Sequence, residues 1–188
     1  MNVQELCADL DRYARDGVLC AHTAADLLRR RIASGIDLDP ELCAGETDGY
    51  SARLLHATPA CSVLALTWLP GQMTPIHDHI SWCVVGVLAG AELDESFQLW
   101  RIGGRRVLVP AGQTTSTAGR VTVLEPPDED IHRVSNPGRV PAVSLHIYGA
   151  DIRHNGNSSI NRVFGEPIAA EPPPGARQIH WRTERRAA

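Results

Sequence analysis

The segment from Pro70 to Gly90 reads PGQMTPIHDHISWCVVGVLAG and places two histidines two residues apart, between a turn and an apolar run. On a strand, residues i and i+2 face the same side. His77 and His79 can therefore reach one metal ion with little rearrangement, and imidazole suits zinc, copper, iron and nickel alike. An isolated His-x-His pair is more commonly a pair of polar residues on a solvated loop, so the surrounding pattern decides between these interpretations.

One glycine precedes the first histidine by six residues, and another follows the second by eleven, at the end of the hydrophobic run. This frame resembles the first sequence motif of the cupin barrels. Residues 127–136 read PDEDIHRVSN and resemble the second cupin motif, with His132 and Asn136 in place and Glu129 where glycine is usual. The resemblance implies that His132 is a third metal ligand beside the two upstream histidines.

The chain departs from the usual cupin pattern at one ligand position. Most metal-binding cupins carry a glutamate ligand four or five residues after the second histidine, whereas this chain has Cys83 and Val84 there and no acidic residue before Glu92. The predicted ligands are therefore three neutral histidines without a carboxylate. A divalent ion held this way keeps its double positive charge and, if octahedral, about three open positions. Such a centre favours a chelating anionic substrate plus one further ligand.

Length and composition fit a single domain of an ordinary globular protein, with 188 residues, 43% of them hydrophobic. A net charge of -4 gives no reason to expect nucleic acid as a partner. No apolar run approaches the length of a transmembrane helix, and the amino terminus is acidic and polar rather than a signal sequence. We expect a cytoplasmic protein with no membrane partner, as a monomer or small homo-oligomer.

An odd number of cysteines without tight pairing predicts free thiols: Cys7, Cys20, Cys43, Cys61 and Cys83.

Residues 2–35 are predicted to form two helices, because apolar side chains recur there at helical spacing. Gly17 ends the first pattern, and Thr23 is expected to be the N-cap of the second, which runs up to Gly35. We expect these helices to cover an end of a barrel rather than to carry catalysis.

From Tyr50 onward, short runs of β-forming residues are punctuated by glycine and proline. Candidate strands are 50–56, 61–69, 82–89, 97–102, 106–109, 121–125, 131–135, 142–149 and 161–164, with turns at 70–71, 103–104, 110–112 and 137–138. Many strands without intervening helices predict an all-β fold, a double-sheet jelly roll of the cupin double-stranded β-helix type with short N-terminal α-helices. The expected division is a helical cover (1–48), the cupin barrel (49–170) and an extended C-terminal tail (171–188).

Three polar side chains alternate with apolar ones in the stretch 142–149, AVSLHIYG. Alternation places Ser144, His146 and Tyr148 on one face of the strand. An exposed polar strand face is the alternative, but next to a metal site the row is expected to be a hydrogen-bonded relay with the phenol as its terminal acid or anchor.

Together, the three histidines, this row and the strand from Trp82 to Gly90 resemble the cysteine dioxygenase family of thiol dioxygenases, from about Tyr50 to Gly149. Members are small cupins with a three-histidine iron(II) site that add both atoms of O₂ to a thiol sulfur and give a sulfinic acid. The resemblance implies Fe(2+) as cofactor, a small thiol and O₂ as substrates, and a catalytic role for the row. Three histidines alone leave nickel and cobalt open.

In animal members of that family a cysteine and the relay tyrosine are joined by a thioether crosslink next to the iron, and Cys83 and Tyr148 match those positions. If residues 77–83 form one continuous strand, Cys83 shares the face of both histidines. The spacing from the second histidine to this cysteine is one residue shorter than in the animal enzymes, and many bacterial members have glycine there. Both a Cys83–Tyr148 crosslink and a site without one are therefore left open by the sequence.

The residue that reads the substrate is where the match to the family breaks. Members selective for cysteine usually carry Tyr-x-Arg-x-Leu on an early strand, and the arginine pairs with the carboxylate. Residues 50–55 read YSARLL, so Ala52 stands in that place and Arg53 lies one step on, which on a strand is the opposite face unless a bulge intervenes. Mercaptopropionate dioxygenases use an arginine after the tyrosine of the row, for which Arg153 and Arg162 are candidates. We expect one of the three arginines to bind the substrate carboxylate.

The sequence thus predicts a metal-dependent thiol dioxygenase, with cysteine as the first substrate and 3-mercaptopropionate as the second. A specialised relative that gives a rearranged product on cysteine or another thiol stays open. The alternative from another class is a cupin that binds a metal or small metabolite without turnover, or a cupin isomerase. The Ser144-His146-Tyr148 row argues against it, because a binding module has little need of a proton relay.

Overall fold

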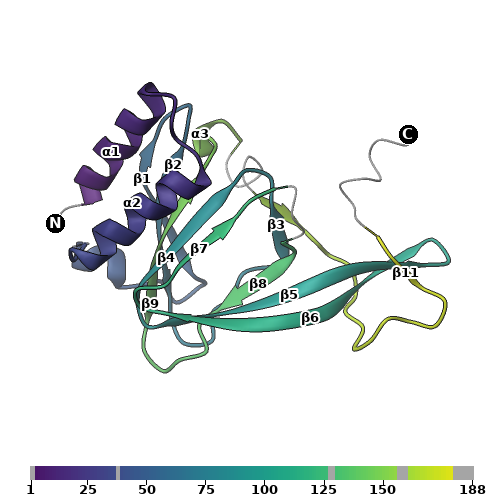
Figure 1. Ribbon diagram of the computed structural model, residues 1–188. Coiled ribbons are helices and arrows are strands. Elements are labelled where there is room, and N and C mark those ends of the chain that lie inside the picture. Colours follow the sequence, from purple (N-terminus) through teal and green to yellow (C-terminus); the bar gives the residue numbers. More distant parts are fainter. Residues whose placement is uncertain (1–2, 37–38, 127–129, 156–160, 180–188) are drawn as a thin grey trace.

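The computed structural model of the protein describes residues 3–36, 39–126, 130–155 and 161–179, and its strands form two antiparallel sheets (Figure 1). The five-stranded sheet has the order β1-β2-β9-β4-β7 and consists of β1 (Ser51–Ala57), β2 (Ser62–Trp68), β4 (Cys83–Ala89), β7 (Val121–Leu124) and β9 (Ala142–Tyr148). The second sheet has the order β10-β3-β8-β5-β11, with β6 paired to β5, and consists of β3 (His77–His79), β5 (Ala91–Ile102), β6 (Arg105–Thr117), β8 (His132–Ser135), β10 (Asn161–Val163) and β11 (Arg177–Gln178). The predicted all-β double-stranded β-helix with short N-terminal helices is confirmed.

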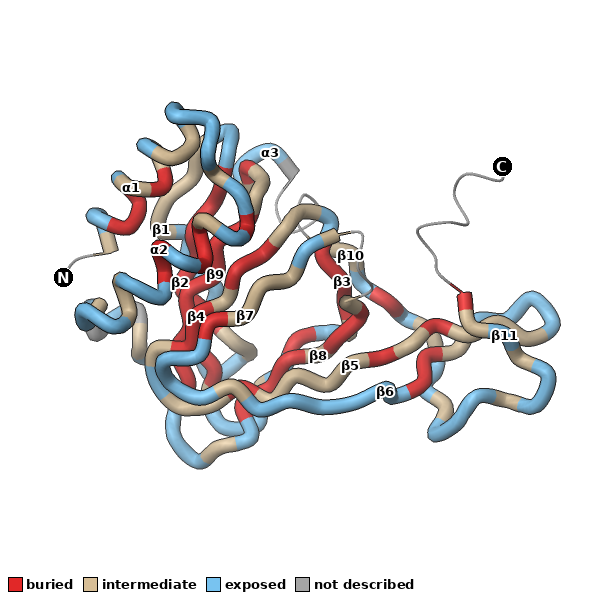
Figure 2. The backbone as a smooth tube through the Cα atoms, in the orientation of Figure 1, coloured by how far each residue is buried: buried red, intermediate tan, exposed pale blue. Residues whose placement is uncertain are grey.

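The centre of the five-stranded sheet is buried on both of its faces. Strands β2 and β9 are buried at all seven of their positions (Figure 2). Alternation sends Val63 and Leu145 toward the helices, while Leu64 and Tyr148 point toward the second sheet. The inward face of β9 is therefore the one that carries the polar row.

Two helices cover the outer face of the five-stranded sheet rather than an end of the barrel. They are α1 (Val3–Arg15) and α2 (Ala21–Ala33), and α2 lies against β4 and β7. Their apolar side chains join those of the sheet in one core cluster, which includes Leu6, Leu10, Leu27, Leu28, Val84 and Ile147. Among the described residues, no helix is long and apolar enough to cross a membrane.

The second helix begins earlier than predicted. Cys20, not Thr23, is its N-cap residue, and the Thr23 side chain instead accepts a hydrogen bond from the Cys20 backbone N–H at 2.9 Å. Thr23 thus takes the N3 position of a capping box, which satisfies a backbone donor that the first turn leaves open. All five cysteines are free, as expected.

The hairpin β5–β6 is longer than the sequence patterns predict. The predicted turn at 110–112 is wrong, because these residues lie inside β6, where the register with β5 shifts between Ser96 and Phe97. Pro110 fits there because β6 is an edge strand and the irregularity removes the need for a ladder N–H at this point. The predicted turn at Gly103-Gly104 is confirmed, with both residues at positive φ, 52° and 81°.

The segment 77–83 is not one continuous strand. Strand β3 ends at His79 in the second sheet, and β4 begins at Cys83 in the five-stranded sheet, so residues 80–82 carry the chain from one sheet to the other. The metal-site histidines and Cys83 therefore approach the interior from opposite sheets. This arrangement makes the space between the sheets the meeting point of the predicted site residues.

The C-terminal segment returns to the second sheet. Beyond the short helix α3 (Ile152–Asn155), β10 pairs with β3 and β11 pairs with β5. Ile179 is buried against Phe97, Leu99 and Leu108. Residues 177–179 of the predicted tail thus pair with and pack against the sheet, whereas the predicted tail beyond them, with Trp181, lies outside the described residues.

Candidate metal centre

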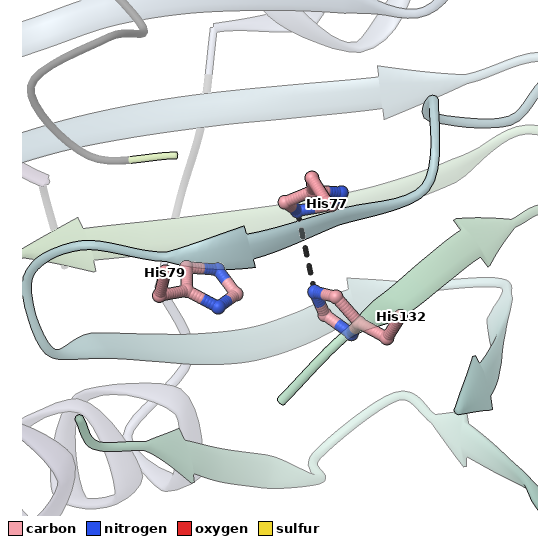
Figure 3. Close-up of side chains that lie close together, drawn as sticks. All are labelled: His77, His79 and His132. Atoms are coloured by element: carbon pink, nitrogen blue, oxygen red, sulfur yellow. Dashed lines mark hydrogen bonds between the residues drawn. The ribbon is translucent and has the colours of Figure 1, made fainter. Parts of the chain in front are cut away.

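Three histidines converge between the two sheets (Figure 3). His77 and His132 are direct partners across β3 and β8, and His79 follows two positions along β3 on the same face. One ring nitrogen of each histidine lies within 4.8 Å of the others. All three side chains are buried. Strand pairing thus brings His132 next to His77, 55 residues earlier in the chain, in a site shielded from water.

Each imidazole is held by a hydrogen bond through its other ring nitrogen. The Nδ1–H groups donate to the Pro75 carbonyl (His77, 3.0 Å), the Asp130 carboxylate (His79, 2.6 Å) and the Asp94 carboxylate (His132, 2.8 Å). Such partners fix the tautomer and direct the Nε2 lone pair toward a metal ion. Metal-binding histidines in proteins typically show this arrangement.

Burial keeps two of the three imidazoles neutral at pH 7. Burial lowers the pKa of His77 to about 3, with the neighbouring His132 and His79 adding to the effect, and burial also lowers the pKa of His79. Neutral imidazoles are what a metal ion requires. The Nε2 atoms of His77 and His132 lie 3.2 Å apart. With both Nδ1 atoms protonated, two lone pairs face each other, and one ion at about 2.1 Å from each nitrogen fits them.

The polar row on β9 lies across the interior from the histidines. Ser144 Oγ and His146 Nε2 are 3.0 Å apart, and Tyr148 OH and His146 Nδ1 are 3.3 Å apart. The ring centroids of Tyr148 and His79 are 6.1 Å apart, so the phenol end of the row is the one next to the metal centre. The structure thus assembles the predicted row in hydrogen-bonded order and on the predicted face.

Burial sets the protonation of this row. It lowers the pKa of His146 to about 3 and raises the pKa of Tyr148 well above its usual value. The imidazole is therefore neutral and the phenol protonated at pH 7. With the phenol donating to His146 Nδ1, the Nε2–H of the same ring donates to Ser144 Oγ.

Cys83 stands directly opposite Tyr148 on the neighbouring strand β4. Its thiol is fully buried, and burial raises its pKa, while a hydrogen bond with Tyr148 acts in the other direction. The thiol and the phenol are therefore in direct contact beside the metal centre.

A cavity of about 70 Å³ adjoins the three histidines and the row. Apolar side chains from both sheets form much of its wall, with Glu92, Asp94 and Asn161 among the polar ones. Neither these three residues nor Asp130 were predicted from the sequence to belong to the site. Alternation along β5 would have put Glu92 and Asp94 on one face, but nothing local indicated that this face is the inner one.

The three arginines predicted to bind a carboxylate lie away from this cavity wall. Arg53 is within 3.9 Å of Glu46, and its neighbour Ala52 is the β1 residue that lines the cavity. Arg153 pairs with Asp151 at 2.6 Å. Arg162 forms an ion pair with the buried Asp78, whose position between the two β3 histidines faces the other side of the strand. Their predicted role in substrate binding stays a prediction.

Several solved structures with low sequence identity share part of the fold. A Klebsiella pneumoniae protein with a double-stranded β-helix domain is 16% identical, with a TM-score of 0.49 over 70% of this chain and 98% of that chain. A cupin superfamily protein of Desulfitobacterium hafniense is 13% identical, with a TM-score of 0.45 over 59% of this chain and 86% of that one. An oxalate decarboxylase of Bacillus subtilis is 19% identical, with a TM-score of 0.45 over 63% of this chain and 29% of that one.

The family model for cysteine dioxygenase type I matches residues 45–154, which include both β3 histidines, His132 and the whole Ser144-His146-Tyr148 row. This match spans more than half of the chain and confirms the predicted resemblance. The protein therefore belongs to the cysteine dioxygenase type I family.

Proposed function

We propose that the protein is a metal-dependent thiol dioxygenase that oxidises the sulfur of a small thiol to a sulfinic acid. The observation that carries this proposal is the meeting of three buried, oriented histidines with a Ser-His-Tyr row, across one small cavity, in a chain of this family. In the reaction R–SH + O₂ → R–SO₂H, both oxygen atoms are added to sulfur, and the four electrons that sulfur loses reduce O₂.

Iron(II) is the proposed cofactor, held by Nε2 of His77, His79 and His132. When bound there, it supplies Lewis acidity, which favours the thiolate form of the substrate, and the redox activity that a reaction with O₂ requires. Nickel and cobalt also accept three imidazole ligands. Metal content and activity after reconstitution with each ion separate these alternatives.

The Ser144-His146-Tyr148 row is proposed to orient the reactants and hold a proton beside them. Because burial keeps the Tyr148 phenol protonated, it carries a proton at the cavity wall, which it donates to His146 Nδ1 until a bound reactant accepts it instead. His146 fixes the direction of that hydroxyl, and Ser144 fixes the imidazole ring. Such preorganised donors stabilise charge that develops on substrate or oxygen atoms.

The test is oxygen uptake by iron-loaded protein with a panel of thiols, including cysteine and 3-mercaptopropionate, with the product identified by mass. We expect uptake and a product that carries two additional oxygen atoms. His132→Ala should lose metal and uptake together, whereas His22→Ala, which removes an exposed histidine on α2, should lose neither. Metal binding without uptake for every thiol would overturn the proposal in favour of a binding cupin. A product other than the dioxygenated thiol would point to the specialised relative with a rearranged product.

A further inference from the structure

The wall of the cavity beside the histidines carries no arginine or lysine among the described residues. The 18 basic residues of the chain are all arginines. Among the residues that the structure describes, none of them lines the cavity. A substrate carboxylate is usually held by the paired donors of an arginine. Within the described part of the chain, a carboxylate bound in this cavity would meet no such partner.

Acidic side chains take the place of the missing cation. Glu92 and Asp94 lie two positions apart on β5 and both line the cavity. Asp94 accepts the Nδ1–H of His132, so it is committed to the metal centre. Among the described residues, Glu92 forms no hydrogen bond with the three histidines. A second carboxylate brought in by a substrate would meet like charges in a poorly solvated space, which disfavours it.

One oxygen of Glu92 is left without a partner. The residue is 4% exposed, and Oε1 has no hydrogen-bond partner among the described residues. Ser144 lies beside the carboxyl group and favours its ionised form, against the effect of burial, which raises the pKa of Glu92. The neighbouring Trp68 N–H also favours the ionised form of Glu92, although it forms no hydrogen bond of normal geometry, and a neutral donor does not replace a cation beside a buried carboxylate. A bound cation would supply both the charge and the hydrogen bond.

We infer that the substrate of the proposed dioxygenase is a small aminothiol without a carboxylate, whose sulfur faces the three histidines and whose ammonium group donates a hydrogen bond to Glu92. This inference rests on the proposed function and names the substrate class of the same site. Thiolate and ammonium then meet opposite charges at the two ends of the cavity: the metal ion at one and the Glu92 carboxylate at the other. The acidic wall rejects thiols that end in a carboxylate.

Three thiols with the same two-carbon chain and different charge test the inference: 2-aminoethanethiol (positive), 2-mercaptoethanol (neutral) and 3-mercaptopropionate (negative). Cysteine and 3-aminopropane-1-thiol are added to vary the charge and the chain length. Oxygen uptake by the iron-loaded protein should show a kcat/KM for the better aminothiol at least about tenfold above that for 3-mercaptopropionate. Calorimetric titration of the iron protein with the same thiols under argon should give the same order of affinity without turnover.

Glu92→Gln keeps the shape of the side chain and removes its charge. It should reduce the ratio of kcat/KM for the aminothiol to kcat/KM for 2-mercaptoethanol by about tenfold. The change should appear as a higher KM for the aminothiol and as a weaker affinity for it under argon. Glu95→Gln is the matched control, because Glu95 lies on the same strand, pairs with Arg133 at 2.9 Å and does not line the cavity. It should leave the preference unchanged.

The possible results separate this inference from the function on which it rests. Oxygen uptake that favours 3-mercaptopropionate or cysteine would overturn the aminothiol assignment and leave the dioxygenase intact. A preference for the aminothiol that Glu92→Gln does not reduce would also overturn it. If no thiol supports uptake but the aminothiol binds preferentially under argon through Glu92, the dioxygenase fails while the ligand assignment stands.

Discussion

Cys83 and Tyr148 lie directly opposite each other on the adjacent strands β4 and β9, and their thiol and phenol groups are in contact beside the three histidines. They come from segments 65 positions apart, and both side chains are buried. The pairing arises because β9 lies between β2 and β4, so that the last residue of β9 meets the first of β4.

This contact predicts a thioether crosslink after turnover. Formation of the S–C bond removes one hydrogen from the thiol and one from the phenol ring, with O₂ as the oxidant. Iron-loaded protein incubated aerobically with its thiol should therefore lose two hydrogen atoms in intact mass, and a peptide joining residues 83 and 148 should appear on digestion. Cys83→Ser should keep its calculated mass under the same treatment. An unchanged wild-type mass after many turnovers would exclude the crosslink.

Removing the carboxylate that orients His132 should weaken metal binding. Asp94→Ala deletes the acceptor of the His132 Nδ1–H bond at 2.8 Å, so the ring is free to rotate and to change tautomer. Loss of such a partner typically lowers metal affinity by about 10- to 100-fold. Competition with a chromophoric chelator measures this affinity. Glu95→Ala, one position along β5 and outside the cavity, should bind metal as the wild type does, and equal affinities for both variants would contradict the assigned role.

The metal-free protein should lose stability as the pH falls below about 6.5, the ordinary pKa of histidine. Burial lowers the folded-state pKa values of His77 and His146 to about 3, so between these limits the unfolded chain binds protons that the folded chain does not. Each such histidine lowers the free energy of unfolding by about 1.4 kcal/mol per pH unit across this window. Denaturant titrations at pH 6.5, 5.5 and 4.5 measure the slope.

His146→Gln provides the check on this slope, because it removes one titrating ring without replacing a metal ligand. The variant should show a dependence on pH that is shallower by about the contribution of one histidine. The same slope in both proteins would mean that His146 does not stay neutral in the folded chain.

Gly149 should be intolerant of any side chain. A Cβ atom there would lie 2.2 Å from Nε1 of Trp82, which precedes Cys83 and covers the end of β9. Gly149→Ala forces the indole ring or the strand to move, and we expect a loss of about 1–3 kcal/mol in the free energy of unfolding. Gly165→Ala is the matched control, because a Cβ there meets nothing within 4 Å, and it should change stability by less than about 0.5 kcal/mol. A variant at position 149 as stable as this control would show that the ring moves freely.

Much of the site was predictable because strand geometry is local. His77 and His79, and the alternating Ser144, His146 and Tyr148, needed only the two-residue period to be placed on common faces. The strands themselves followed from β-forming runs between glycines and prolines. The helix start at Cys20 and the irregularity at 110–112 were mispredicted, because they depend on one backbone donor and on an edge strand that the local pattern does not reveal.

Residue order and spacing predicted most element types and the pair of His77 and His79, since each follows from which residue types recur at which short interval. The resemblance to known motifs added His132 and the family. The convergence of those elements depended on pairings between strands far apart in the chain: His77 with His132, and Cys83 with Tyr148. The same long-range pairings put Glu92 on the cavity wall and left Arg53, Arg153 and Arg162 off it. Which side of a strand faces the interior is set by the packing of the two sheets against each other, and no local interval encodes it.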